Sequence, residues 1–175
     1  SLVKGKQSSI AHLVDDGLVE FVEGDIRNRD IVDKAVSGTD YVFHTAGVHI
    51  KRSVASPEEC LEVNIRGSYN VFKSALDHGV KRVIFSSSSS VYGIKEEPNV
   101  HEDMSLEPLT DYSKFKMNCE EILSEYQSDD FTTTTIRPAT ICGYSPRQRL
   151  DVVVNILTNL AYHKREISVF GGDQL

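Results

Sequence analysis

The stretch KRVIFSSSSSVYG, residues 81–93, decides the fold. Its RVIF segment is a short apolar run rich in β-branched and aromatic residues, which is typical of a strand buried on both faces of a sheet. The serine run that follows at 86–90 is polar and indicates a turn. The stretch therefore predicts a buried strand that delivers hydroxyl groups to one edge of a sheet.

Strand and helix patterns alternate on both sides of this stretch. A short β-rich segment at 18–25, an apolar run at 40–47 and the segment FTTTTIRPATICG at 131–143 predict further strands. Helical spacing of apolar residues predicts helices at 29–38, 56–79, around Tyr112 and at 151–164, and a short ISVFGG segment follows. For the helix at 56–79 we expect Ser56 as the cap, Pro57 at the first position and Gly79 as the stop. The alternation predicts an α/β fold, a parallel sheet with helices on both faces.

Composition excludes several classes of protein. Of 175 residues, 39% are hydrophobic and 26% charged, as in an ordinary soluble domain, and no apolar run is long enough to span a membrane. The opening SLVKGKQSSI lacks the apolar segment of a signal peptide, and we expect a cytoplasmic protein. A net charge of −7, with no basic cluster beyond SPRQRLD at 145–151, argues against a nucleic-acid partner. The separated Cys60, Cys119 and Cys142 indicate reduced packing residues, with no metal site.

Tyr112 and Lys116 lie four residues apart, which places them on the same face of a helix. A cation beside the phenol would favour the phenolate, lower the pKa of Tyr112 and make it a usable base. A surface pair would explain the spacing equally well. In a parallel sheet, however, ligands bind outside the carboxyl ends of the strands. The small and hydroxyl residues GD, TAG, SSSSS and RPAT follow the predicted strands at those ends, which favours a functional site.

Six motifs in this order resemble those of a known family. They are GDIRN (24–28), HTAG (44–47), NIRGSYNV (64–71), VIFSSSSSVYG (83–93), YSKFK (112–116) and RPATICG (137–143). Together they resemble the extended short-chain dehydrogenases/reductases, specifically the NAD-dependent nucleotide-sugar epimerase/dehydratase family, from about residue 18 to the end. The resemblance implies a Rossmann-like doubly wound sheet. It also implies a partial NAD-binding and catalytic domain at 1–165 and the start of a substrate-binding lobe at 166–175.

The resemblance implies specific site residues, with NAD as the cofactor. The catalytic residues would be Tyr112 as base, Lys116 holding the nicotinamide ribose and lowering the tyrosine pKa, Ser88 as the hydroxyl partner, and Asn64 as a structural and proton-relay group. The cofactor would contact Asp25, Ile26, Thr45, Ala46, Gly47, Ser86, Ser87, Tyr112, Lys116, Pro138 and Ala139. The nucleotide-sugar substrate would contact Ser88, His49, Arg147, Arg149 and Phe170.

Simpler roles stay open for several of these residues. Asp25 could be a turn residue after a strand, Ser87 is the rival to Ser88, and Asn64 could bridge a buried backbone group. We expect His44, inside a strand, to be a hydrogen-bonded core residue.

The loops carry the remaining alternatives. His49 and Lys51 could lie in a solvated loop instead of a substrate channel. Arg147 and Arg149 could clamp a diphosphate or belong to an exposed basic loop.

The serine run also bears on the reaction. Dehydratases of the family carry an Asp–Glu pair just before VYG, where this chain has Ser89 and Ser90. Elimination of water is therefore disfavoured, and 4-epimerisation of the UDP-glucose/galactose type is the first hypothesis. A sugar or sterol-type dehydrogenase or reductase, or a non-catalytic Rossmann-like module that binds a nucleotide or partner, is the alternative. The resemblance further implies a homodimer through a four-helix bundle formed by the helices at 56–79 and 110–127.

The chain departs from the family at its start. Family members begin with a strand and a G-x-x-G-x-x-G turn that holds the pyrophosphate, and no such turn is present. We therefore expect the sequence to be an internal portion of a longer enzyme. The acidic residue that separates NAD from NADP would fall before Ser1, so that choice, like the identity of the sugar, stays open.

Overall fold

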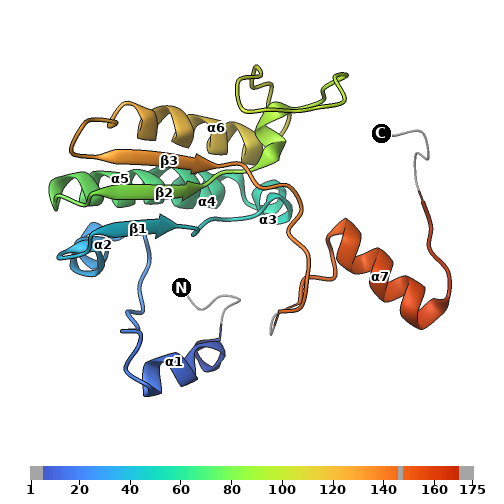
Figure 1. The fold of residues 1–175 in the computed structure, drawn as a ribbon, viewed down its shortest axis with the longest axis horizontal. Coiled ribbons are helices and arrows are strands. Elements are labelled where there is room, and N and C mark those ends of the chain that lie inside the picture. The colour runs from blue at the N-terminus through green and yellow to red at the C-terminus, as the bar shows by residue number, and fades with distance from the viewer. Residues whose placement is uncertain (1–5, 146–147, 170–175) are drawn as a thin grey trace.

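The computed structural model describes residues 6–145 and 148–169, and it contains a parallel sheet of three strands in the order β1-β2-β3 (Figure 1). In register, Phe43 pairs with Ile84, and Ile84 pairs with Thr134. The strands are β1 (Tyr41–His44), β2 (Arg82–Ser86) and β3 (Thr132–Ile136). The predictions of strands within 40–47, 81–93 and 131–143, and of their parallel arrangement, are confirmed.

Helices connect these strands, as the alternating pattern predicted. Before β1 lie α1 (Ala11–Asp15) and α2 (Arg29–Val36). Between β1 and β2 lie α3 (Ile50–Ala55), α4 (Pro57–Leu61) and α5 (Ser68–Asp77), and between β2 and β3 lies α6 (Asp111–Ser124). After β3 comes α7 (Val153–Lys164), which stands away from the sheet and has no buried residue. Short 3-10 turns occupy Gln7–Ser9 and Ser89–Tyr92.

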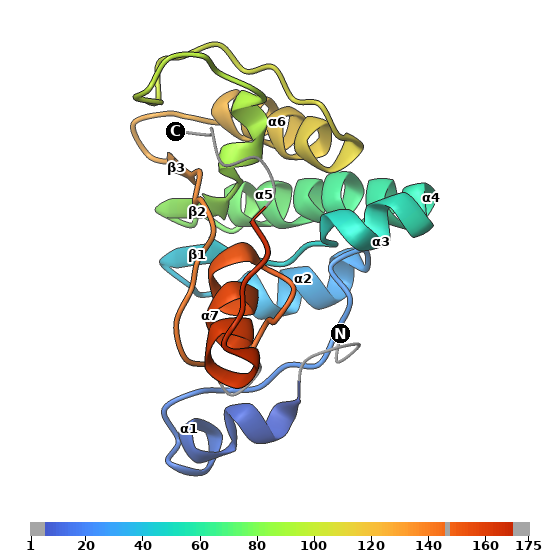
Figure 2. The same cartoon turned by 90° about the vertical axis from the view of Figure 1, so that its right-hand side faces the viewer.

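Helices α2, α5 and α6 gather on one face of the sheet (Figure 2). Val83 and Phe85 point toward them and are completely buried. Strand alternation turns Tyr41 and Phe43 to the opposite face, where they are 59% and 72% exposed. Helix packing on both faces was expected. In the part of the chain that the structure describes, the helices that pack on the strands all lie on the same face of the sheet.

The core lies between this helical layer and the sheet. Phe72 of α5 and Phe85 of β2 meet edge to face with ring centroids 5.4 Å apart, and Leu123 of α6 is completely buried beside them. Burying one such side chain contributes about 1.5–3 kcal/mol. These contacts fix α6, and with it Tyr112 and Lys116, against the carboxyl end of β2.

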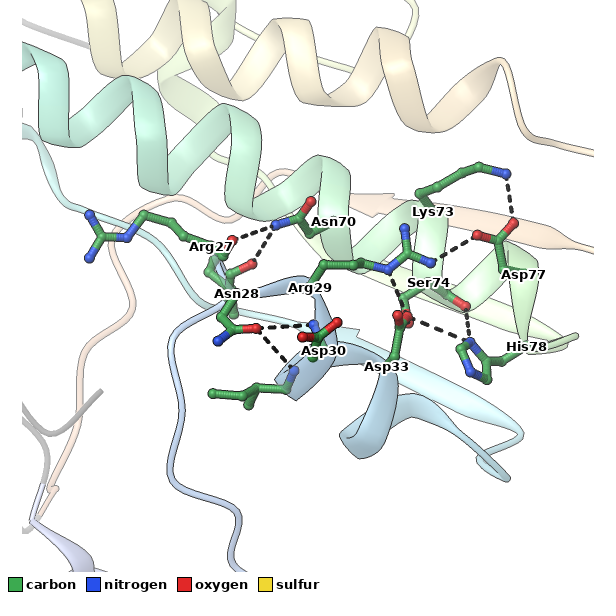
Figure 3. A network of polar contacts seen from close by, with 12 residues as sticks. Arg27, Asn28, Arg29, Asp30, Asp33, Asn70, Lys73, Ser74, Asp77 and His78 are labelled. Carbon is green, nitrogen blue, oxygen red and sulfur yellow. Dashed lines mark hydrogen bonds and ion pairs between the residues drawn. The ribbon is translucent and has the colours of Figure 1, made fainter.

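A polar network joins α2 to α5 (Figure 3). Arg29 of α2 bonds Asp33 at 2.7 Å and reaches across to Asp77 of α5 at 2.8 Å. Ser74 of α5 donates to Asp33 at 2.6 Å, and Asn28 caps the start of α2 by accepting from two backbone amides. Because these bonds involve both helices, they fix the position of α2 along α5.

The prediction of a strand at 18–25 is wrong. Residues 19–25 have no regular structure, and Leu18 is 72% exposed. A strand needs a hydrogen-bonding neighbour, and among the described residues β1 pairs only with β2. Apolar content alone therefore did not make this segment a strand.

The single helix expected at 56–79 is interrupted. Between α4 and α5, residues Glu62–Gly67 form a turn of π-helix. Pro57 occupies the first turn as predicted and Gly79 adopts φ 69° just after the end, but the Ser56 side chain makes no capping hydrogen bond. The extra backbone of the π-turn lies at Asn64, where a functional side chain was predicted.

Candidate active site

A cavity of about 660 Å³ lies at the carboxyl ends of β2 and β3. It gathers side chains from the serine turn, the start of α6 and the segment after β3. Among the residues that line it are His49, Ser86, Ser87, Ser88, Ser89, Ser90, Tyr112, Pro138, Ala139, Arg149 and Asn155. Most of the residues predicted for the nicotinamide and sugar therefore share one cavity.

Helix α6 positions Tyr112 in the lining of this cavity and Lys116 behind the Ser86 backbone. The Oγ1 of Thr110 caps the helix by accepting from the Ser113 amide at 3.2 Å. Lys116 is only 5% exposed, and its Nζ donates to the Ser86 carbonyl at 2.7 Å. The same Nζ lies 5.9 Å from the centre of the Tyr112 ring, so the predicted shared face is confirmed.

Burial dominates the ionisation of this pair. It raises the pKa of Tyr112, while a hydrogen bond from Ser88 and the charge of Arg149 act in the opposite direction. Burial also lowers the pKa of the Lys116 ammonium. The predicted lowering of the Tyr112 pKa is therefore not found in this chain, because desolvation of the phenolate outweighs the charges around it.

The serine run separates into different roles. Ser87 is buried and donates a short hydrogen bond to Glu120 of α6. Ser88 is partly exposed and lines the cavity together with Tyr112, whose pKa it acts to lower. Of the two rivals, Ser88 therefore has the hydroxyl that is available to Tyr112, and the Ser87 hydroxyl is engaged with Glu120.

An ion pair supports that wall from behind. Arg137 NH2 lies 2.6 Å from Glu120 Oε2, and Arg137 NH1 donates to the Tyr92 hydroxyl at 2.9 Å. Glu120 is 8% exposed, and the hydrogen bonds that its carboxylate accepts from Arg137 raise the pKa of Arg137. The four side chains thus link α6 and the 3-10 turn to the residues that follow β2 and β3. They are Ser87, Glu120, Arg137 and Tyr92.

Asn64 in the π-turn holds the loop that follows β1. Its Oδ1 accepts from the Val48 amide at 2.7 Å, and its Nδ2 donates to the Val48 carbonyl at 3.0 Å. This is the backbone-bridging role left open by the sequence, while the proton-relay role stays a prediction. At Gly47, an added Cβ would come within 3.2 Å of Asn64 Oδ1 and 3.7 Å of Lys116 Nζ. Glycine therefore leaves backbone open beside Lys116, as close approach of a flat ligand requires.

A second cavity of about 380 Å³ contains the residues predicted for the adenine end, Asp25, Ile26, Thr45 and Ala46. Asp25 accepts from the Arg27 amide at 2.9 Å and pairs with its guanidinium at 2.6 Å, which lowers the pKa of the carboxyl group. Asp25 therefore has the turn role that the sequence left open. Its contact with adenine stays a prediction.

The remaining predicted residues have mixed outcomes. His44 is a buried core residue whose Nε2 lies 2.8 Å from Ser68 Oγ, as expected. Arg149 lines the first cavity and pairs with Asp151 at 3.1 Å. Cys60 and Cys119 are buried, but Cys142 is exposed and so is not a packing residue.

Some predictions lie beyond the described side chains. Arg147 and Phe170 lie outside the described residues, as does the side chain of Lys51. Within the described ranges, no cluster of His, Cys, Asp and Glu could hold a metal ion, and no helix is long and apolar enough to cross a membrane.

Comparison with known proteins identifies the family. The model of the "NAD dependent epimerase/dehydratase family" matches residues 2–175. The chain belongs to this family. The resemblance drawn from the six motifs is confirmed.

Curated members of the epimerase/dehydratase family match most of the chain. The N-acetyl-alpha-D-glucosaminyl-diphospho-ditrans,octacis-undecaprenol 4-epimerase of Escherichia coli O157:H7 is 34% identical over 142 residues, 79% of this chain and 41% of that protein. The low-salt glycan biosynthesis protein Agl12 of Haloferax volcanii is 28% identical over 169 residues, 95% of this chain and 54% of that protein. The chain thus spans about half the length of these relatives.

Solved structures confirm the Rossmann-like fold. DesIV, a dTDP-glucose 4,6-dehydratase from Streptomyces venezuelae crystallised with NAD and TYD, gives a TM-score of 0.75 at 26% identity, with 91% of this chain and 50% of that chain covered. A UDP-N-acetylglucosamine 4-epimerase from Methanobrevibacter ruminantium M1, in complex with UDP-N-acetylmuramic acid, gives 0.73 at 29% identity, with 87% and 50% covered. Epimerases and dehydratases of the family therefore share this fold.

The sequence did not indicate the groups that lie behind the cavity. Glu120 lies four residues after Lys116 on α6, a spacing that could have marked it as a neighbour. The roles of Arg137, Ser90 and Ser113 depend on contacts between segments far apart in the sequence. No local sequence pattern indicates such contacts.

Proposed function

We propose that this chain carries the catalytic residues of an NAD-dependent nucleotide-sugar 4-epimerase, with a substrate of the UDP-glucose/galactose type. The observation that carries the proposal is that Ser88 and Tyr112 line one cavity, with the buried Lys116 ammonium 5.9 Å from the centre of the Tyr112 ring. Oxidation of a sugar hydroxyl needs a base for its proton and a donor to the carbonyl oxygen that develops. Tyr112 and Ser88 supply these two groups from adjacent positions.

The residues at the carboxyl ends of the strands fit a dinucleotide. Asp25, Ile26, Thr45 and Ala46 line one cavity and Pro138 and Ala139 the other, while the open backbone of Gly47 lies next to Lys116. Bound NAD would accept a hydride from the sugar and return it, which no side chain can do. Lys116 would hold the ribose next to the nicotinamide, and a positive charge beside Tyr112 would counter the effect of burial on its pKa.

Epimerisation is favoured over dehydration by the side chains of the turn. Ser89 and Ser90, both at the cavity, offer hydroxyl groups where elimination would call for carboxylates. Substrate would contact Ser88, His49 and Arg149, together with Arg147 and Phe170. A homodimer through the α4–α5 segment and α6, and a cytoplasmic location, complete the proposal.

The decisive experiment incubates the purified protein with NAD+ and UDP-galactose and follows UDP-glucose formation. Binding of NAD+ and of the sugar nucleotide is measured separately by calorimetry. We expect Tyr112→Phe to abolish turnover and to preserve binding, because only the ionisable hydroxyl is lost. Net consumption of NAD+ without epimer would instead support a dehydrogenase. NAD+ or nucleotide binding without turnover in the unaltered protein would support the binding-module alternative.

A further inference from the structure

Four hydroxyl groups form a continuous chain that ends at Ser88, in the lining of the cavity that also contains Tyr112. Thr110 Oγ1 lies 2.7 Å from Ser113 Oγ, Ser113 Oγ donates to Ser90 Oγ at 3.0 Å, and Ser90 Oγ donates to Ser88 Oγ at 2.9 Å. The Ser88 hydroxyl in turn acts to lower the pKa of the Tyr112 phenol. The chain connects the cap of α6 to the 3-10 turn after β2.

This chain has a single direction. A hydroxyl group has one hydrogen to donate and two lone pairs that accept. Because Ser113 gives its hydrogen to Ser90, the hydrogen between Thr110 and Ser113 belongs to Thr110. Each of these groups therefore donates toward Ser88.

Ser88 receives two hydrogen bonds from one residue. The amide of Ser90 donates to Ser88 Oγ at 3.2 Å, and the hydroxyl of Ser90 donates to the same oxygen at 2.9 Å. Both lone pairs of Ser88 are then occupied, and its own hydrogen is left for Tyr112. If the Ser90 hydroxyl were absent, Ser88 could rotate and accept from Tyr112 instead of donating to it.

We propose that Ser90 and Ser113 are positioning residues that hold the Ser88 hydroxyl as a donor to the Tyr112 oxygen. Ser113 is 2% exposed, so it anchors the chain where water does not compete, whereas Ser90 lies in the open cavity. A donor to the phenolate stabilises the charged form, and successive donors polarise one another. The two serines thus help Tyr112 to lose its proton.

The inference rests on the proposed function only for the role of Tyr112 as base, since the hydroxyl chain itself is tested without turnover. The protein is prepared with 3,5-difluorotyrosine, whose phenol ionises at lower pH than that of tyrosine, so that the titration stays where the protein is folded. Fluorine NMR follows ionisation, and Tyr112→Phe assigns the signal. We expect Ser90→Ala to raise the Tyr112 pKa by about half a pH unit, roughly a threefold change in proton affinity, and Ser113→Ala to raise it less.

Two further variants separate positioning from packing. Ser90→Thr keeps the hydroxyl and should restore the unaltered pKa, while Ser89→Ala removes a neighbouring hydroxyl of the same turn and should leave it unchanged. The inference is overturned if Ser90→Ala titrates like Ser89→Ala, or if Ser90→Thr behaves like Ser90→Ala. A shifted pKa in a protein that shows no epimerase turnover would contradict the proposed function and leave the positioning role intact. Epimerase turnover without any shift in the Tyr112 pKa would contradict the positioning role and leave the proposed function intact.

Discussion

At the scale of single residues, Glu120 connects more of the cavity wall than any group predicted from the sequence. Its carboxylate accepts from the Ser87 hydroxyl and from Arg137 Nε and NH2, the last at 2.6 Å. Arg137 also donates to the Glu102 carbonyl at 3.0 Å. Removing the carboxylate charge would leave a partly buried guanidinium without its counter-ion.

We expect Glu120→Gln to lower the free energy of unfolding by about 2–3 kcal/mol, less than the ~3–5 kcal/mol for a fully buried pair, because Arg137 keeps some solvent contact. Urea unfolding at neutral pH measures this. Glu121→Gln is the matched control, because Glu121 is the next residue of α6 and is exposed, so its effect should stay within about 0.5 kcal/mol. Equal effects of the two substitutions would show that the ion pair does not stabilise the wall.

At the scale of secondary-structure elements, the turn after β2 is fixed by Gly93. This residue closes the 3-10 turn with φ 72° and ψ −142°, a conformation open essentially to glycine alone. A Cβ there would lie 2.2 Å from the Glu107 carbonyl oxygen. The backbone of Glu107 in turn donates to the Val91 carbonyl at 3.0 Å, so the segment cannot move away freely. Gly93 thus secures the turn that presents Ser88.

Gly93→Ala should therefore lower the free energy of unfolding by more than the ~1–3 kcal/mol of backbone strain alone, since a backbone clash adds to it. Gly38→Ala is the control: Gly38 has a similar φ of 77° with nothing within 4 Å of an added Cβ, so only strain applies. Thermal unfolding of both variants gives the comparison. If the Gly93 variant is no less stable than the Gly38 variant, the Glu107 segment moves aside to accommodate the added Cβ.

The same elements show which parts of the fold could be predicted. The predicted strands at 41–44, 82–86 and 132–136 form because each segment, rich in β-branched or aromatic residues, has a neighbouring strand to pair with. Residues 18–25 have the same local character and fail, since pairing is not a local property. The π-turn at 62–67 was not predicted, because the spacing of apolar residues does not reveal one extra residue in a helical turn.

At the scale of the whole molecule, the site was predictable where sheet topology brings strand ends together. Tyr112, Lys116 and Ser88 meet because parallel strands place their carboxyl ends at one edge. The direction of the Tyr112 pKa was not predictable, because burial depends on everything packed around the phenol. Glu120 pairs with Arg137 across 17 residues and Ser113 with Ser90 across 23, and such partners are defined only by the folded chain.

Burial of His44 couples the stability of the whole fold to pH. Desolvation beneath α5, aided by the charge of Lys116, lowers its pKa from 6.5 to about 3, so the ring stays neutral in the folded state. In the unfolded chain the ring takes up a proton below pH 6.5. Between pH 6.5 and about 3 the unfolded state therefore binds one proton more, and stability is lost as pH falls.

From pH 7 to pH 5, this one group should lower the free energy of unfolding by about 2 kcal/mol, at about 1.4 kcal/mol per pH unit below 6.5. His44→Gln keeps an amide that can bond to Ser68 but removes the titration. Urea unfolding of both proteins at the two pH values isolates the contribution, because the carboxyl groups are common to both. We expect the variant to lose about 2 kcal/mol less than the unaltered protein over this interval. Equal losses would mean that the core admits a proton on His44 without unfolding.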